Sequence, residues 1–253
     1  MEKSSNIKKI ILITGKHSRF CSFLKKDLKR YKTYFTSKNN FNLLNFNQMK
    51  KFIKKKEITH LIHIAGLSRP MDLHEKDINL SIDLNVIGTA NIVKLCNLFK
   101  IKLIYFSTNY VYPGETGNYK ESSKLLPFNN YAWSKLGGES SVQLYKHSLI
   151  LRLCMTDFPF THKKAIKGAW SSFIFNKDVS KIIPHILDEF GILNIGGERK
   201  DIYQFAKKFN GKIKSINYKK IKNFPKDSSL NTEKLVAILK KKKTQNLKNK
   251  YIN

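Results

Sequence analysis

Short apolar runs alternate with longer amphipathic stretches over the first half of the chain. The apolar runs predict buried strands, and the stretches with apolar residues three and four positions apart predict helices. The expected strands cover residues 9–14, 34–35, 60–65, 102–107 and 148–153, and the expected helices cover 20–31, 47–56, 78–99 and 129–145. Strands and helices that alternate at this spacing form a parallel sheet with right-handed crossovers. The pattern therefore predicts a doubly wound, Rossmann-type α/β domain.

The pattern becomes looser after residue 153. Residues 155–171 are polar and indicate a loop or small lid. Further helices are expected at 178–190, 201–209 and 231–243, with a short strand at 193–195. We therefore expect a Rossmann domain over residues 1–153. Residues 154–253 would form a small C-terminal lobe, interleaved with the end of the sheet and ending in a basic tail from about residue 240.

Composition limits the class of protein. The chain has 253 residues, enough for one substantial core, and its hydrophobic content of 41% is typical of a globular protein. No apolar run approaches the roughly 18 to 20 residues that cross a bilayer. Cys21, Cys96 and Cys154 are widely spaced, without a Cys-x-x-Cys pair or a nearby histidine cluster, so no structural metal is expected. These features favour a reduced chain in the cytoplasm, away from the membrane.

The charge balance is strongly basic. Lys and Arg number 48 against 18 Asp and Glu, which gives a net charge of +30. Clustered cations bind nucleic-acid phosphates, but here they are nearly all lysine and are spread along the whole chain. Lysine lacks the planar fork with which arginine reads bases and phosphates. Specific nucleic-acid binding is therefore not expected, whereas attraction for an anionic nucleotide fits the field.

The candidate chemistry lies where the expected strand 102–107 ends. Thr108 follows this strand directly, and Tyr131 and Lys135 are one helical turn apart in the next expected helix. Because positions i and i+4 share a helix face, the Lys135 ammonium can lie beside the Tyr131 phenol and lower a pKa that is normally about 10. Such a pair transfers protons, which indicates an oxidoreductase. Other Tyr-x-x-x-Lys pairs occur in the chain, so the inference depends on the position after the strand.

A candidate cofactor turn follows the first strand. The strand runs into Gly15 and a helix begins soon afterwards, an arrangement that places a diphosphate at a helix N-terminus. A full Gly-x-x-Gly-x-x-Gly pattern would also need glycine at Ser18 and Cys21. Ser18 could donate to a phosphate and Cys21 is small enough for tight packing, so a cofactor turn and a turn that binds nothing both remain open. Lys38, after the second strand, suits a 2′-phosphate, which favours NADP(H) over NAD(H).

Taken in order, these motifs resemble the extended short-chain dehydrogenase/reductase superfamily, and most closely its dTDP-4-dehydrorhamnose reductase-like, NAD-dependent epimerase/dehydratase group. The resemblance rests on segments 14–15, 63–66, 85–89, 107–112, 131–135, 173–179 and 225–235. It implies an NADP(H)-dependent reductase of a 4-keto-6-deoxy sugar nucleotide in deoxysugar or polysaccharide synthesis, whose C-terminal lobe binds the substrate. A non-catalytic, NAD(P)-binding regulatory or scaffolding relative is the alternative.

The resemblance also assigns catalytic roles. Thr108 would bond the reacting oxygen of the substrate, Tyr131 would exchange its proton, and Lys135 would hold the nicotinamide ribose. Asn109 would contact the substrate. Asn109 and Tyr110 stand where related dehydratases carry an acidic pair, so simple reduction fits better than dehydration.

The remaining assignments concern the cofactor and the dimer. By the resemblance, Ala65 and Gly66 would line the path of the cofactor diphosphate and ribose. Asn85 would help to hold the active-site geometry, as one of the cofactor-binding residues. Arg152, at the end of a strand, could clamp a substrate diphosphate or pair with a structural carboxylate, and both remain open. The superfamily's equivalents of helices 78–99 and 129–145 form a dimer contact, so a homodimer is implied.

Overall fold

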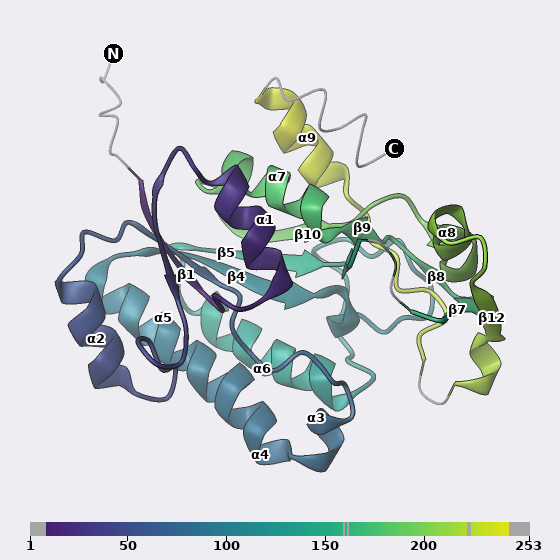
Figure 1. The fold of residues 1–253 in the computed structure, drawn as a ribbon, viewed down its shortest axis with the longest axis horizontal. Coiled ribbons are helices and arrows are strands. Elements are labelled where there is room, and N and C mark those ends of the chain that lie inside the picture. The colour runs from purple at the N-terminus through teal and green to yellow at the C-terminus, as the bar shows by residue number, and fades with distance from the viewer. Residues whose placement is uncertain (1–8, 159, 161, 222–223, 243–253) are drawn as a thin grey trace.

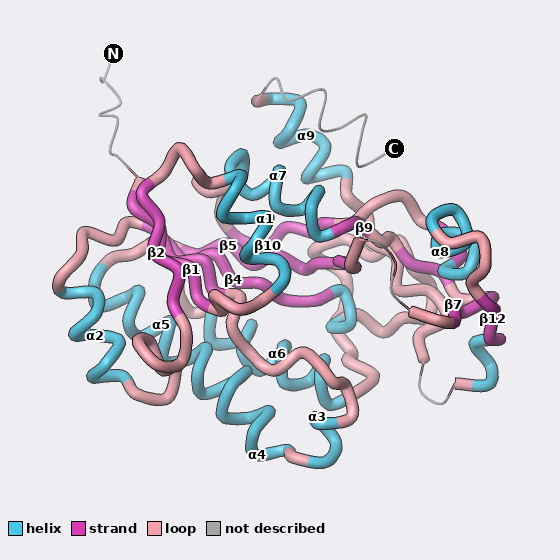
Figure 2. Tube along the Cα trace, in the orientation of Figure 1, coloured by secondary structure: helices cyan, strands magenta, loops and turns pink. Residues whose placement is uncertain are grey.

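The computed structural model describes residues 9–158, 160, 162–221 and 224–242. Six parallel strands form its central sheet: β1 (Ile10–Thr14), β2 (Lys32–Thr36), β3 (His60–His63), β4 (Lys102–Thr108), β5 (Ser148–Leu153) and β10 (Gly191–Ile195). Their order across the sheet is β10-β5-β4-β3-β1-β2. Figures 1 and 2 show this sheet between its covering helices. This arrangement confirms the predicted doubly wound α/β fold. The strand order reverses between β1 and β3, which makes the edge beyond these two strands the expected ligand site.

Helices cover both faces of the sheet (Figure 1). One face carries α1 (Arg19–Asp27), α7 (Asn176–Ile186) and α9 (Glu233–Lys241), and the other carries α2 (Phe46–Lys54), α5 (Gly88–Phe99) and α6 (Asn130–Gln143). Because side chains alternate along a strand, β1 contributes to two cores. Ile11 and Ile13 pack under α1 and α7, whereas Ile10 and Leu12 pack toward α2 and α5.

The expected helix 78–99 is interrupted by a π-helical turn. It consists of α4 (Ile78–Ser81), the π-helical segment η1 (Ile82–Ile87) and α5. Asn85 lies within the π turn and is 1% exposed. π turns are frequent at functional sites, and this one presents Asn85 to the loop that follows β3.

The region after β5 is more ordered than the predicted loop. It contains β6 (Met155–Thr156), β7 (Lys164–Lys167), β8 (Trp170–Ser171), β9 (Ile174–Phe175), β11 (Lys200–Asp201), α8 (Ile202–Phe209) and β12 (Lys214–Asn217). These strands form three small two-stranded sheets beside the carboxyl ends of the main strands. Between them, α7 and β10 return to the main sheet, so the lobe is interleaved with it. Most of the expected basic tail, beyond residue 242, lies outside the described residues.

Short helical turns complete the fold: α3 (Leu73–Lys76), η2 (Asn109–Val111) and η3 (Tyr218–Lys220). None of the helices within the described part of the chain is both long and apolar enough to span a membrane.

Candidate active site

A cleft of about 1460 Å³ lies at the carboxyl ends of the central strands, between the sheet and the lobe. Its walls include the residues that follow β1, β3 and β4, together with the beginning of α6 and parts of β7. It therefore contains the position at which the strand order reverses, where open α/β sheets bind their ligands.

The turn after β1 is closely packed against the loop after β3. Gly15 has φ +84°, and a Cβ on it would lie 3.2 Å from the Ala65 nitrogen and 3.3 Å from the Ala65 Cα. Glycine is therefore required there, both for the backbone angle and for the close approach. Ser18 lines the cleft as the N-cap of α1, where its hydroxyl oxygen accepts from the Cys21 N–H at 3.3 Å.

Cys21 does not face the cleft. Its side chain is 3% exposed in the core under α1, and its thiol donates to the Gly15 carbonyl at 3.1 Å. The thiol therefore lies beneath the turn, in the tight packing between α1 and the sheet, and the place of Cys21 among the cofactor-binding residues remains a prediction. The cleft above the turn is not blocked by this residue.

The loop after β3 is held from two sides. The Thr14 hydroxyl accepts from the Ile64 N–H at 3.1 Å and from the Ala65 N–H at 3.0 Å. Asn85 accepts from the Leu67 N–H at 2.8 Å and donates to the Leu67 carbonyl at 2.9 Å. These bonds present the backbone at residues 65–66 to the cleft.

Ala65 and Gly66 line the cleft, as expected, and a Cβ on Gly66 would lie 2.6 Å from the Asn85 side-chain oxygen. Asn85 itself is buried behind the loop and also donates to the Ser134 hydroxyl at 2.8 Å. All its polar atoms are used within the protein, so Asn85 positions the loop. A direct contact between Asn85 and the cofactor remains a prediction.

The three predicted catalytic side chains, Thr108, Tyr131 and Lys135, line the same cleft. Thr108 ends β4, and its hydroxyl accepts from the Tyr110 N–H at 3.3 Å. Burial raises the pKa of Tyr131, while the nearby Thr108 hydroxyl and the Arg69 charge oppose that rise. The phenol therefore retains its proton at neutral pH.

Lys135 does not produce the predicted lowering of the Tyr131 pKa, and that expectation is wrong for this arrangement. Its ammonium lies over the Tyr105 ring, 4.3 Å from the centroid. Burial lowers the pKa of Lys135 to about 7, and the charge of Glu139, one turn further along α6, opposes this effect. The lysine charge is therefore sensitive to pH near neutrality.

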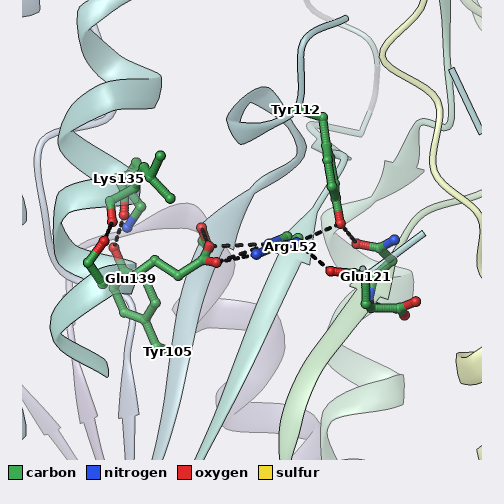
Figure 3. Close-up of polar contacts among 10 residues, drawn as sticks. Tyr105, Tyr112, Glu121, Lys135, Glu139 and Arg152 are labelled. Atoms are coloured by element: carbon green, nitrogen blue, oxygen red, sulfur yellow. Dashed lines mark hydrogen bonds and ion pairs between the residues drawn. The ribbon is translucent and has the colours of Figure 1, made fainter. Parts of the chain in front are cut away.

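A buried polar network lies beneath these residues (Figure 3). Arg152 is 1% exposed, forms an ion pair with Glu139, and its Nη1 donates to the Tyr112 hydroxyl at 2.9 Å and to the Glu121 carbonyl at 3.0 Å. Glu139 also accepts from the Ser107 hydroxyl at 2.7 Å. Arg152 thus pairs with a structural carboxylate. Of the two roles left open for Arg152, the structure thus shows the pairing, and a contact with the substrate remains a prediction for a residue that does not line the cleft.

Two further predicted residues lie in the cleft wall. Asn109 lines it at the start of η2, with its amide donating to the Ser228 carbonyl at 3.0 Å. Lys38 lines it after β2. Their assignments to substrate and to the 2′-phosphate remain predictions.

Sequence reasoning missed four cleft or near-cleft residues. Arg19, Arg69 and Asp157 line the cleft, and the His74 ring packs against the Tyr131 ring with centroids 5.1 Å apart. The one available signal was that arginine is scarce in this lysine-rich chain. Nothing in the spacing of these residues indicates that they meet.

More than half of the chain matches a known protein family. A family model described as the RmlD substrate binding domain matches residues 8–156. The chain belongs to this family. The beta subunit of methionine adenosyltransferase 2 from Xenopus laevis is 36% identical over 101 residues, which cover 40% of this chain and 30% of that protein.

A probable low-salt glycan biosynthesis reductase from Haloferax volcanii is 41% identical over 70 residues, 26% of this chain and 23% of that protein. The chain thus matches less than a third of the length of these curated relatives.

Solved structures resemble the whole fold. That of dTDP-4-dehydrorhamnose reductase from Bacillus anthracis in complex with NADP has a TM-score of 0.82 and 20% identity, covering 91% of this chain and 93% of that one. That of a hypothetical dTDP-4-dehydrorhamnose reductase from Sulfolobus tokodaii has a TM-score of 0.80 and 24% identity, covering 90% and 94%. At these identities the likeness establishes the shared fold.

The Glu139–Arg152 pair leads to a stability prediction. Glu139→Gln leaves the Arg152 charge buried without its anion, so we expect the free energy of unfolding to fall by about 3 to 5 kcal/mol. The double variant Glu139→Leu/Arg152→Met removes both charges and should recover most of that loss. Urea unfolding of the two variants measures the difference. A double variant no more stable than the single one would contradict this account of the pair.

The Lys135 pKa leads to a pH prediction. Its folded value of about 7 lies below the ordinary 10.5, so the unfolded chain binds more protons between these two pH values. By linkage, stability contributed by this group rises as the pH rises through that window. The stability of wild type relative to Lys135→Met should therefore increase from about pH 7 to about pH 10. The exposed Lys207→Met is the control, and a pH-independent difference for Lys135→Met would refute the prediction.

Proposed function

We propose that this protein is a cytoplasmic, NADP(H)-dependent reductase of a 4-keto-6-deoxy sugar nucleotide, acting in deoxysugar or polysaccharide synthesis. The main support is that Thr108, Tyr131 and Lys135 meet in one cleft with the Gly15 turn. The names of the solved structures with the same fold agree with this reaction class. A purely scaffolding relative is not favoured, because scaffolding alone gives no reason for these three side chains to share a cleft.

The residues of the cleft fit a dinucleotide. Gly15, Ala65 and Gly66 line the cleft, where a dinucleotide would pass along their backbone. The N-terminus of α1 offers N–H groups and the positive end of the helix dipole to a diphosphate. Lys38 would hold the 2′-phosphate. When bound, NADPH supplies the hydride.

The side chains of this chain would handle the proton. Thr108 would donate to the carbonyl oxygen of the substrate and hold it beside the Tyr131 phenol. Tyr131, whose pKa is raised by burial, holds its proton until negative charge develops on that oxygen and then donates it. The Arg69 charge, which already opposes the rise in the phenol pKa, would stabilise the phenolate that remains, and Lys135 would hold the nicotinamide ribose. This division of roles suits reduction, in which the enzyme must supply a proton.

Tyr131→Phe tests the mechanism. Removing the phenol hydroxyl removes the proton donor, so we expect kcat to fall about 10²- to 10⁴-fold while NADPH binding is retained. Loss of nicotinamide absorbance with a 4-keto-6-deoxy sugar nucleotide measures turnover, and quenching of NADPH fluorescence measures binding.

Tyr203→Phe is the matched control, since Tyr203 and Lys207 repeat the same spacing in α8 but do not line the cleft. It should turn over normally. Normal turnover by Tyr131→Phe would exclude the mechanism, and wild type that does not bind NADPH would favour the non-catalytic alternative.

We also propose a homodimer through the helices of segments 78–99 and 129–145. These segments lie on the same face of the sheet (Figure 1) and expose large apolar side chains. The side chains are Ile78, Ile82, Ile87, Leu98, Trp133 and Leu144. Their exposed fractions range from 42% to 86%, which is costly for apolar groups that no partner covers.

Charge placed on this surface should prevent association. Trp133 is 51% exposed, so Trp133→Glu should preserve the fold and give a monomer in sedimentation. Phe190→Glu places the same charge on an apolar residue that is 55% exposed outside this surface, and it should remain dimeric. A monomeric wild type would contradict the proposed dimer.

A further inference from the structure

Two arginines from different parts of the cleft donate to one carboxylate oxygen. Arg19 begins α1, and its Nη1 lies 2.9 Å from the Asp157 Oδ2. Arg69 lies in the loop after β3, and its Nη1 lies 3.0 Å from the same oxygen. Asp157 follows β6, and its other oxygen accepts from the Asn176 amide at 2.7 Å. All four residues line the cleft.

The charges in this cluster do not balance. Two guanidinium groups share one carboxylate, which leaves one positive charge in excess. Asp157 has a side-chain exposure of 12%, whereas the arginine side chains are 71% and 56% exposed. Within the described residues, each guanidinium uses only Nη1, in its bond to Asp157. Their remaining N–H groups are available to a further anion.

The position of the cluster joins the two functional parts of the cleft. Arg19 is adjacent to Ser18, the N-cap at the glycine turn. Arg69 is close enough to Tyr131 for its charge to oppose the rise in the phenol pKa. A ligand that extends from the turn to the catalytic phenol would therefore pass both guanidinium groups.

A diphosphate is the group that best matches this arrangement. It carries several negative charges on adjacent tetrahedral centres, and guanidinium forks bond such oxygens bidentately. A single carboxylate already lies between the two arginines, so the cluster is organised around an anion.

We propose that Arg19 and Arg69 form a diphosphate-binding pair, and that Asp157 lies where the diphosphate would bind and competes with it. This inference rests on the proposed function, because it names the residues that hold a ligand in the same cleft. The arginine pair would also give the turn a source of positive charge besides the helix N-terminus. This source matters because Ser18 and Cys21 stand where the full glycine pattern has two glycines.

The diphosphate has two possible sources, the cofactor or the nucleotide sugar. Binding of NADPH, of dTDP and of inorganic pyrophosphate should be measured by calorimetry at low salt. The variants are Arg19→Gln, Arg69→Gln and their double. We expect each single change to weaken binding about tenfold, with a larger loss in the double variant. Losses confined to NADPH and pyrophosphate identify the cofactor, and losses confined to dTDP and pyrophosphate identify the nucleotide sugar.

Arg199→Gln is the matched control. Arg199 is also an exposed arginine paired with a carboxylate, Asp227, at 2.8 Å, but it does not line the cleft. It should leave all three affinities unchanged. Asp157→Asn removes the competing charge while keeping the side-chain shape, so it should bind the same probes more tightly.

The outcomes separate this inference from the proposed function. Arginine variants that bind NADPH, dTDP and pyrophosphate as tightly as wild type, or weaker binding by Asp157→Asn, would overturn the inference alone. Wild type that binds pyrophosphate through the arginines, but neither nucleotide, would retain the pair and refute the proposed function. Wild type that binds none of the three probes would refute both.

Discussion

Glu139 on α6 and Arg152 on β5 bury two full charges against each other beneath the cleft. A buried charge without a partner is costly, so the helix and the strand must keep the relative position that pairs them. Glu139 also accepts from Ser107, the residue before Thr108, and lies one helical turn from Lys135. One carboxylate thereby sets the distance between the end of β4 and the catalytic face of α6. The bond from Arg152 to the Glu121 carbonyl extends this constraint to the loop before α6.

The same network determines the charges that the cleft can use. Since the Arg152 guanidinium is bonded beneath the cleft, it contributes no cation to a ligand there. The Lys135 ammonium, whose pKa is about 7, lies over the ring of Tyr105. The positive charge that acts on the Tyr131 phenol is therefore that of Arg69. The net charge of +30 draws anions toward the whole surface, and in our proposal Arg19 and Arg69 determine where an anion is held.

Apolar periodicity was sufficient to predict the main strands and the crossover helices, because these follow from local spacing. It also placed Thr108 and Tyr131 in one cleft, because parallel strands end at the same edge of the sheet. It could not predict that Arg152 points below the cleft, since its partner Glu139 lies on another element. Nor could it find the pairing of Arg19 and Arg69, which are far apart in sequence and meet only through Asp157. The i, i+4 rule placed Lys135 near Tyr131 correctly, but the Tyr105 ring, a tertiary neighbour, decides where the ammonium lies.

The glycine turn shows how a departure from a motif can be accommodated. Glycine at the position of Cys21 would allow α1 to pack closely on the sheet, and a larger residue should force them apart. Here the thiol enters the core and donates to the Gly15 carbonyl at 3.1 Å, while Ser18 caps the first turn of the helix. Phe20 and Phe106 pack beside it with ring centroids 5.2 Å apart. The turn keeps the one glycine whose backbone angle and contact with Ala65 require it, so its shape depends on these bonds and not on the number of glycines.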